Sequence, residues 1–290
     1  MNQIRSLHTA RMNIVRMRGR SAFALVVVTL VGAAAFTWPF FASADSVNAG
    51  GLPHSSDAPW LFVALLPLLL AVLFAEMADG TLDAKGIAML GVLAACGAAL
   101  RPLGGGATGF TGVFFLMIPA GRVLGRGFGF VLGALTLFAS ALLTAGVGPW
   151  LPFQMVAAGW VGFGAGCLPP ARGRREVVML AVYAAVAGLA YGLVMNLWFW
   201  PFAHNYPRAI SYLPGAAFST NLVHWLHHDL VTSLGFDLPR ALGNFVFVLV
   251  AGRPVLAALR RAARRAAFEQ PVIFEPALTI GPPTNQGAAG

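Results

Sequence analysis

The sequence predicts an all-α polytopic membrane protein with about eight transmembrane helices, six of them in one core, and both termini in the cytoplasm. Three observations predict this class. Hydrophobic residues make up 58% of the 290-residue chain and charged residues only 10%, against about 25% charged in ordinary soluble domains. The apolar residues fall into separate runs, several near the roughly 20 residues that a helix needs to cross a bilayer. The nineteen basic residues collect in alternate gaps between these runs.

The expected spans follow the apolar runs in chain order. They cover residues 21–41, 59–76, 84–100, 110–121, 127–145, 151–168, 177–200 and 239–259. The runs at 21–41 and 177–200 reach full length, whereas those around 84–100 and 110–121 are short. Short spans interrupted by glycine are typical of membrane proteins that hold a ligand in a cavity.

The basic residues orient these spans. All but Arg101, Arg208 and Arg240 lie before the first span, after the second, fourth and sixth spans, or after the last. Because cytoplasmic loops carry the Lys/Arg excess, both termini should face the cytoplasm. The gaps expected outside are 42–58, 101–109, 146–150 and 201–238. The net charge of +9 therefore belongs to helix ends that meet anionic lipid, and we expect no nucleic-acid partner.

The chain divides into four parts: a basic tail at 1–20, two spans with an external loop at 21–80, a six-span core at 84–259, and a tail at 260–290. The last part begins with arginines and then becomes rich in Pro, Gly, Gln and Asn, which is typical of disorder. The first span has the small residues of a signal-peptide cleavage site at 42–44. Its apolar stretch of about twenty residues exceeds the 7–15 of such peptides, so we expect it to be retained.

Two features that the sequence lacks limit how the protein could power transport. The chain has no GxxxxGK[ST] phosphate loop, since its single lysine, Lys85, is followed by Gly-Ile. Its ten acidic residues all lie in gaps or at the ends of expected spans, whereas ion-coupled carriers place carboxylates in mid-membrane. We therefore expect no enzyme, no cofactor and no bound metal, and active transport would need a partner.

The third span carries small residues along one helix face. They are Ala84, Ala88, Gly91, Ala95, Ala98 and Ala99. In lipid, close approach of backbones is a main source of helix association. The face predicts either a docking surface for a partner subunit or, equally, packing on another helix of the same chain.

Several motifs follow this helix. They are RPLG at 101–104, GFTGVFF at 109–115, AGRVLG at 120–125, GPWLPFQM at 148–155, NLWFWP at 196–201 and RALGN at 240–244. Together they resemble the substrate-specific S component of an energy-coupling factor (ECF) vitamin transporter, in particular the cobalamin-type subgroup. The resemblance covers residues 84–259, while the two N-terminal spans lie outside the usual core of that family.

The resemblance implies that ligand binding and ATP hydrolysis belong to different subunits. An S component binds a micronutrient at its extracytoplasmic end, a separate transmembrane coupling subunit grips its small-residue helix, and two ATPase subunits power import. It also implies a multi-pass protein of the plasma membrane. The leading ligand is a corrinoid such as cobalamin, followed by other vitamins and nucleobase-like rings.

The outer gaps predict where such a ligand would bind. The expected binding residues are Trp150, Gln154, Asn196, Trp198, Trp225 and Asn244. Flat aromatic walls with a few neutral amides suit an uncharged or zwitterionic ring. The alternative for each tryptophan is the aromatic belt at the membrane interface. For each amide it is one helix–helix hydrogen bond.

The gap 201–238 also contains an HxxHH box. His224, His227 and His228 would share one face of a helix, with Asp229 beside them. A membrane di-iron enzyme needs more histidines than the six in this chain, so the alternatives are a single divalent-metal site from His224, His228 and Asp229, or a plain amphipathic surface helix with exposed imidazoles covering the pocket. Beyond transport, the sequence leaves open a structural or assembly protein that uses the small-residue face, and a His-box membrane metalloprotein.

The distribution of basic residues predicts the topology. Reporter fusions after Gly50, Gly148 and Pro214 should report the outside, and fusions after Asp83, Gly173 and Arg265 the cytoplasm. A pair of exchanged results within 84–259 would overturn this topology.

Overall fold

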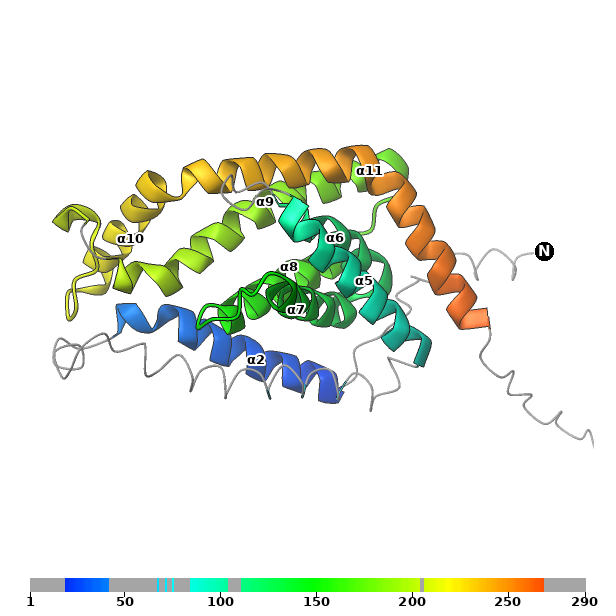
Figure 1. Cartoon of the computed structure of the whole chain (residues 1–290), viewed down its shortest axis with the longest axis horizontal. Helices are drawn as coiled ribbons and strands as arrows, with labels where there is room; N and C mark the ends of the chain where they lie inside the picture. Colours follow the sequence, from blue (N-terminus) through cyan, green and yellow to red (C-terminus); the bar gives the residue numbers. More distant parts are fainter. Residues whose placement is uncertain are drawn as a thin grey trace, which may run out of the picture.

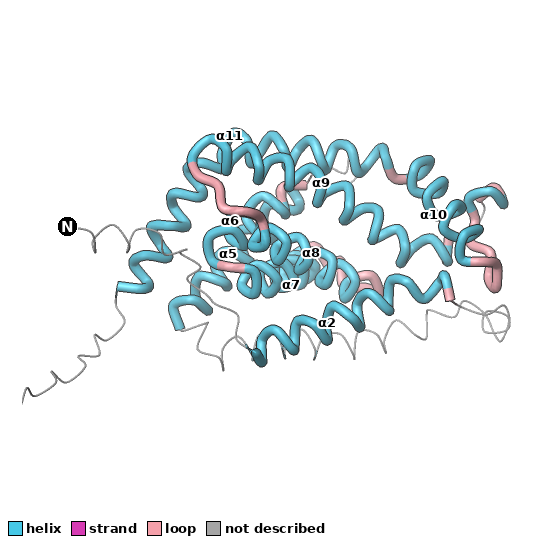
Figure 2. Tube along the Cα trace, turned by 180° about the vertical axis from the view of Figure 1, so that it is seen from behind, coloured by secondary structure: helices cyan, strands magenta, loops and turns pink. Residues whose placement is uncertain are grey.

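The computed structural model describes residues 19–41, 84–103, 111–203 and 206–268, together with Pro67, Ala71 and Ala75. In these parts all regular secondary structure is helical, joined by loops and turns, without a strand (Figures 1 and 2). The elements are α2 (Gly19–Thr37), η2 (Trp38–Phe40), α5 (Ala84–Leu103), α6 (Val113–Leu124), α7 (Arg126–Leu143), α8 (Leu151–Cys167), α9 (Gly173–Phe199), η3 (Trp200–Phe202), η4 (Arg208–Ile210), α10 (Phe218–Thr232) and α11 (Leu234–Phe268).

Every expected span except 59–76, which lies outside the described residues apart from three isolated positions, forms a helix. Five helical segments of the described chain are long and apolar enough to cross a membrane: Gly19–Phe40, Ala84–Pro102, Arg126–Leu143, Gly173–Phe202 and Leu234–Arg265. The prediction of an all-helical chain with several helices able to cross a membrane is confirmed in this coarse form. The number of spans and the side of each terminus stay predictions.

The last helix differs most from its expected range of 239–259. α11 is 35 residues long, begins before Pro239 and continues through the arginines to Phe268. Its extension 255–268 is rich in Ala, Leu and Arg, which are strong helix formers, so the helix outlasts the apolar run. Pro254 lies within it and removes a backbone donor, which accounts for the bend of α11 along the upper edge of Figure 1.

The centre of the bundle is a glycine contact between α6, α7 and α8. A Cβ atom on Gly121 or Gly129 would collide with the backbone carbonyl of Gly162, and one on Gly162 would collide with the carbonyl of Gly129. Gly125, at φ 108°, joins α6 to α7 as a single residue between the two helices. Only glycine allows backbones to approach this closely, and in lipid such contact stabilises helix pairs.

A buried ion cluster ties three helices together at the end of the bundle where α9 begins. The Glu176 carboxylate, 1% exposed, accepts hydrogen bonds from Arg122 Nε at 3.0 Å and from a terminal nitrogen of Arg260 at 2.7 Å. Arg122 also donates to the Leu168 carbonyl at 2.8 Å. Since these arginines come from α6 and α11, the cluster fixes both helices to the start of α9.

The glycine contact predicts that alanine substitutions at two different glycines have different effects on stability. Gly162→Ala should lower the free energy of unfolding by about 1–3 kcal/mol or more, because the added methyl group overpacks the contact with α7. Gly91→Ala is the matched control: nothing lies within 4 Å of its added Cβ, so it should be neutral or stabilising by up to about 1 kcal/mol from helix propensity. Thermal unfolding in detergent measures both, and equal stability of the two variants would contradict the contact.

Candidate functional site

The end of the bundle where α9 ends and α10 lies is called here the α10 end (Figure 1). Buried aromatic side chains gather there. Trp200 is fully buried and its indole N–H donates to the Ile210 carbonyl at 2.9 Å. Trp225, one of the predicted binding residues, is also buried, with its ring centroid 5.9 Å from that of Phe40. Its indole nitrogen has no hydrogen-bond partner. Trp225 therefore belongs to a packed aromatic cluster.

Two further predicted residues, Trp150 and Trp198, lie together at the edge of this end. Their ring centroids are 6.1 Å apart in an edge-to-face arrangement. Trp150 is 36% exposed, and its indole N–H donates to the Gly146 carbonyl at 3.2 Å. Trp198 packs on Phe153, with centroids 6.1 Å apart. This pair presents the partly exposed aromatic surface that the sequence predicted for the mouth.

Gln154 has a partner that the sequence did not suggest. Its side-chain oxygen accepts a hydrogen bond from Arg101, at the end of α5, over 3.3 Å. Arg101 belongs to the few basic residues of the expected outer gaps. The amide thus joins α8 to α5, and it contacts no other predicted binding residue through a hydrogen bond in the described structure.

Asn196 lies in a polar network between α9, α10 and α11. Its side-chain nitrogen donates to the Asp229 carboxylate and to the Ser233 hydroxyl. The Asp237 backbone N–H donates to the Ser233 carbonyl at 2.9 Å, which joins the ends of α10 and α11. The Asp237 carboxylate forms an ion pair with Arg240.

Two neighbouring residues of α9 lie against the Asp237–Arg240 ion pair. A Cβ atom on Gly192 would overlap the Asp237 carboxylate, so glycine at this position leaves the space that the carboxylate fills. The Arg240 guanidinium lies over the Tyr191 ring, 5.5 Å from its centroid, at a separation where cation–π attraction operates. α9 therefore leaves room for the Asp237 carboxylate at Gly192 and places the Tyr191 ring against Arg240.

Asn244 is buried one helical turn after Arg240. Its side-chain nitrogen donates to the Arg240 carbonyl at 2.8 Å, and its side-chain oxygen has no partner. The structure thus places Asn196 beside Asp229 and Ser233, and Asn244 further along α11 beside Arg240. It pairs Trp150 with Trp198, and it places Gln154 and Trp225 in separate contacts.

Asp237 lies in the first turn of α11, at one end of the candidate span Leu234–Arg265, and is 3% exposed. α11 begins five residues before the expected start at Pro239, so Asp237 is part of the helix and not of the expected gap 201–238. The acidic residues of the described chain are Glu176, Asp229 and Asp237, and all three are buried. The spacing of Asp237 to Arg240, three residues apart, is the sequence signal that could have revealed the pair.

The imidazoles of α10 differ in exposure from the expected surface helix: His227 is exposed, His224 is half-buried and His228 is buried. Asn221, His228 and Asp229 are buried, whereas Val223, Leu226, Leu230 and Val231 are exposed. A helix with apolar residues outside and polar residues inside is typical of a protein surrounded by lipid, where polar groups find partners in the interior.

The histidines of α10 have different environments. His224 Nδ1 lies 2.9 Å from the Ser211 carbonyl, His227 is exposed, and the His228 ring packs edge-on against Tyr206 with centroids 5.0 Å apart. Burial lowers the pKa of His228, which keeps the ring neutral at pH 7. Within the described residues no three His, Cys, Asp or Glu side chains form a group that could hold a metal ion.

The small-residue face of α5 divides between exterior and core. Ala84, Ala88, Gly91, Ala95 and Ala99 are exposed in the described structure. Ala98 is fully buried with Leu90 and Ala94 on the side that packs against α6 and α7. Ala98 therefore contributes to internal packing, and the other five positions form one continuous face.

Comparisons of the chain with protein-family models, with curated proteins and with solved structures found no match.

The Asp237–Arg240 pair can be tested by a double-mutant cycle. Arg240→Met leaves the buried carboxylate unpaired and should cost about 3–5 kcal/mol of stability. The double variant Asp237→Asn/Arg240→Met should recover part of this loss, with a coupling energy on the order of 1–3 kcal/mol. Arg208→Met, at an exposed arginine of the same end, should stay within about 0.5 kcal/mol. Additive effects in chemical unfolding would contradict a coupled pair.

Proposed function

We propose that this protein is the membrane-embedded, solute-binding subunit of an importer, and that it binds a small ring-bearing molecule at the α10 end. The observation that carries the proposal is the polar interior at that end. Asn221, Asp229 and Asp237 are buried there under an apolar exterior, which places hydrogen-bonding and charged groups out of reach of lipid. An ionisable residue enclosed in a membrane helix bundle is a functional site by default, because burial is costly and needs a reason.

The chemistry at this end favours an uncharged or zwitterionic ligand. Asp237 is balanced by Arg240, so the ion pair offers opposite charges side by side. The Trp150–Trp198 pair offers ring faces at the edge of the bundle. Aromatic walls with a few oriented polar groups are the usual composition of small-molecule sites. A vitamin of the corrinoid class, or a smaller ring-bearing micronutrient, fits this description and agrees with the resemblance to ECF S components.

The proposed energy source is a partner complex that docks on α5. Ala84, Ala88, Gly91, Ala95 and Ala99 expose a face without bulky side chains, which permits close contact with a helix of another chain. A transmembrane coupling subunit on this face and two ATPase subunits would supply the ATP hydrolysis for which this chain has no phosphate loop.

A second candidate function is supported by the buried carboxylates. Asp237 lies in a candidate span, and Asp229 is enclosed beside Asn196. Carboxylates in such positions serve as proton or cation relays in ion-coupled carriers. Uptake that stops with a protonophore and persists without ATP would favour this candidate over the partner complex. Asp237→Asn should then abolish coupling.

The proposed function predicts separate losses of binding and of partner association. A ligand identified by mass spectrometry of solvent extracts from the purified protein should bind about 5- to 150-fold more weakly to Trp150→Ala and Gln154→Ala, as expected for a loss of about 1–3 kcal/mol per site. Ala95→Leu should bind this ligand normally and lose a co-purifying coupling subunit with its ATPase pair, because the larger side chain blocks close backbone contact.

Ala190→Leu is the matched control, since Ala190 is an exposed alanine on α9, away from the α5 face. This variant should retain both ligand and partners. Unchanged affinity in Trp150→Ala and Gln154→Ala together would exclude the proposed ligand site. Loss of ligand binding in Ala95→Leu would mean that the α5 face supports the fold and not a partner.

A further inference from the structure

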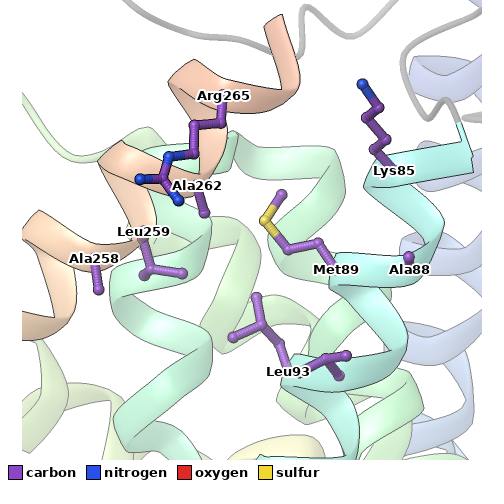
Figure 3. A pocket seen from close by; sticks show the side chains of 9 residues that line it. Lys85, Ala88, Met89, Leu93, Ala258, Leu259, Ala262 and Arg265 are labelled. Carbon is purple, nitrogen blue, oxygen red and sulfur yellow. The ribbon is translucent and has the colours of Figure 1, made fainter. Parts of the chain in front are cut away.

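The exposed side of α10 is an apolar surface, called here the α10 face. Its apolar members, 41–72% exposed, are Phe218, Val223, Leu226, Leu230 and Val231. The other exposed positions of this fully described helix carry Ser219, Thr220 and His227, so none of them is Asp, Glu, Lys or Arg. The apolar groove between α5 and α11 differs, because Lys85 and Arg265 are among its lining residues (Figure 3). An exposed apolar patch of this kind marks a contact with a protein or a membrane.

The first residue of α10 packs against the end of a candidate span. The Phe218 ring centroid lies 5.2 Å from that of Phe40 and 6.1 Å from that of Phe41. Phe40 ends the candidate span Gly19–Phe40, and Phe41, 75% exposed, follows it directly. The α10 face therefore begins in contact with exposed apolar surface at the end of α2.

The last residue of α10 leads into another candidate span. Ser233 alone separates α10 from α11, and its carbonyl accepts a hydrogen bond from the Asp237 backbone N–H at 2.9 Å. Leu238 and Leu242 of α11 are exposed as well, within the candidate span Leu234–Arg265. Because both ends of α10 are fixed at the ends of candidate spans, this helix lies at the level of the membrane boundary, across the end of the bundle (Figures 1 and 2).

We infer that bilayer lipid covers the α10 face, so that α10 lies in the membrane boundary and not in an aqueous loop. Its polar groups on the inward side have partners in the protein. The Asn221 side chain exchanges two hydrogen bonds with the Leu213 backbone, at 2.9 and 3.1 Å, and Asp229 accepts one from Asn196. A helix that satisfies its polar groups inside can place its other side in lipid. Interfacial helices bury their apolar face about 5–10 Å into the boundary between headgroups and acyl chains.

A lipid surface fits the α10 face better than a second copy or another protein does. The rim of a protein interface is polar and supplies hydrogen bonds, whereas from Val223 to Val231 of this described helix His227 is the exposed residue with a polar side chain. A protein on this face would also meet the exposed apolar surface of α2 and of α11 at the two ends of α10. A bilayer that surrounds those two helices reaches the α10 face without a break.

The inference requires neither a bound ligand nor a coupling subunit, so its test is independent of the proposed function. In the full-length chain Cys96 and Cys167, both exposed, are replaced by alanine. Nitroxide labels are then attached to single cysteines introduced at Leu226, Leu230, Arg208 and Val250. The protein is reconstituted in phosphatidylcholine vesicles, and electron paramagnetic resonance measures collisions of each label with oxygen, which concentrates in lipid, and with a water-soluble nickel complex.

The labels at Leu226 and Leu230 should collide several-fold more often with oxygen than with the nickel complex, at a depth of about 5–10 Å below the phosphates. Val250, 74% exposed on the candidate span of α11, is the control for lipid. Arg208, an exposed charged residue of η4, is the control for water and should show the reverse ratio.

Three outcomes would overturn the inference. Ratios at Leu226 and Leu230 equal to that at Arg208 would place the α10 face in water. Few collisions with either reagent would show that a protein surface, such as a second copy, covers the face. Added phosphatidylglycerol should leave the ratios unchanged, because the exposed side of α10 has no basic residue to attract it. Contact with lipid only when this anionic lipid is present would mean that charge, and not the apolar face, places α10 at the membrane.

Discussion

The contact on which the bundle depends is the backbone-to-backbone approach of α6, α7 and α8 at Gly121, Gly129 and Gly162. In lipid, apolar side chains gain little by moving from one apolar medium to another, so helices associate where their backbones can come close. α6 is only 12 residues long, so it is too short to be held in the bundle by a long packing interface. Its packing against both neighbours positions α5 and α11, which pack on it in turn.

The sequence was sufficient for the coarse fold because a bilayer imposes one strong rule: each crossing needs a long apolar helix. It was insufficient for helix ends, since neither Pro239 nor the arginines after Leu259 bound α11, which runs from Leu234 to Phe268. The small residues of α5 drew attention to the wrong internal interface. Gly121, Gly125, Gly129 and Gly133 recur every four residues, and this repeat was the better signal for the central contact.

The candidate site was only partly predictable from the sequence. Orientation from basic residues predicted Asn196, Trp198 and Asn244 near one end. Asn196 and Trp198 lie in the last turn of α9, whereas Asn244 lies further along α11, beside Arg240. The charged members were missed because burial of Asp229 and Asp237 depends on which face of α10 turns inward. Sequence periodicity defines two faces of a helix, and in an aqueous protein the apolar face would be inside. In α10 the buried residues are Asn221, Trp225, His228 and Asp229, so the inward face is mixed and largely polar.

The buried carboxylates at the two ends of the bundle have different partners. Where α9 begins, Glu176 is shared by Arg122 and Arg260, so two cations meet one buried anion. At the α10 end, Asp237 pairs with Arg240, and Asp229 accepts a hydrogen bond from the Asn196 amide. Because a buried charge without a partner is strongly destabilising, these contacts explain how the interior holds all three carboxylates of the described chain.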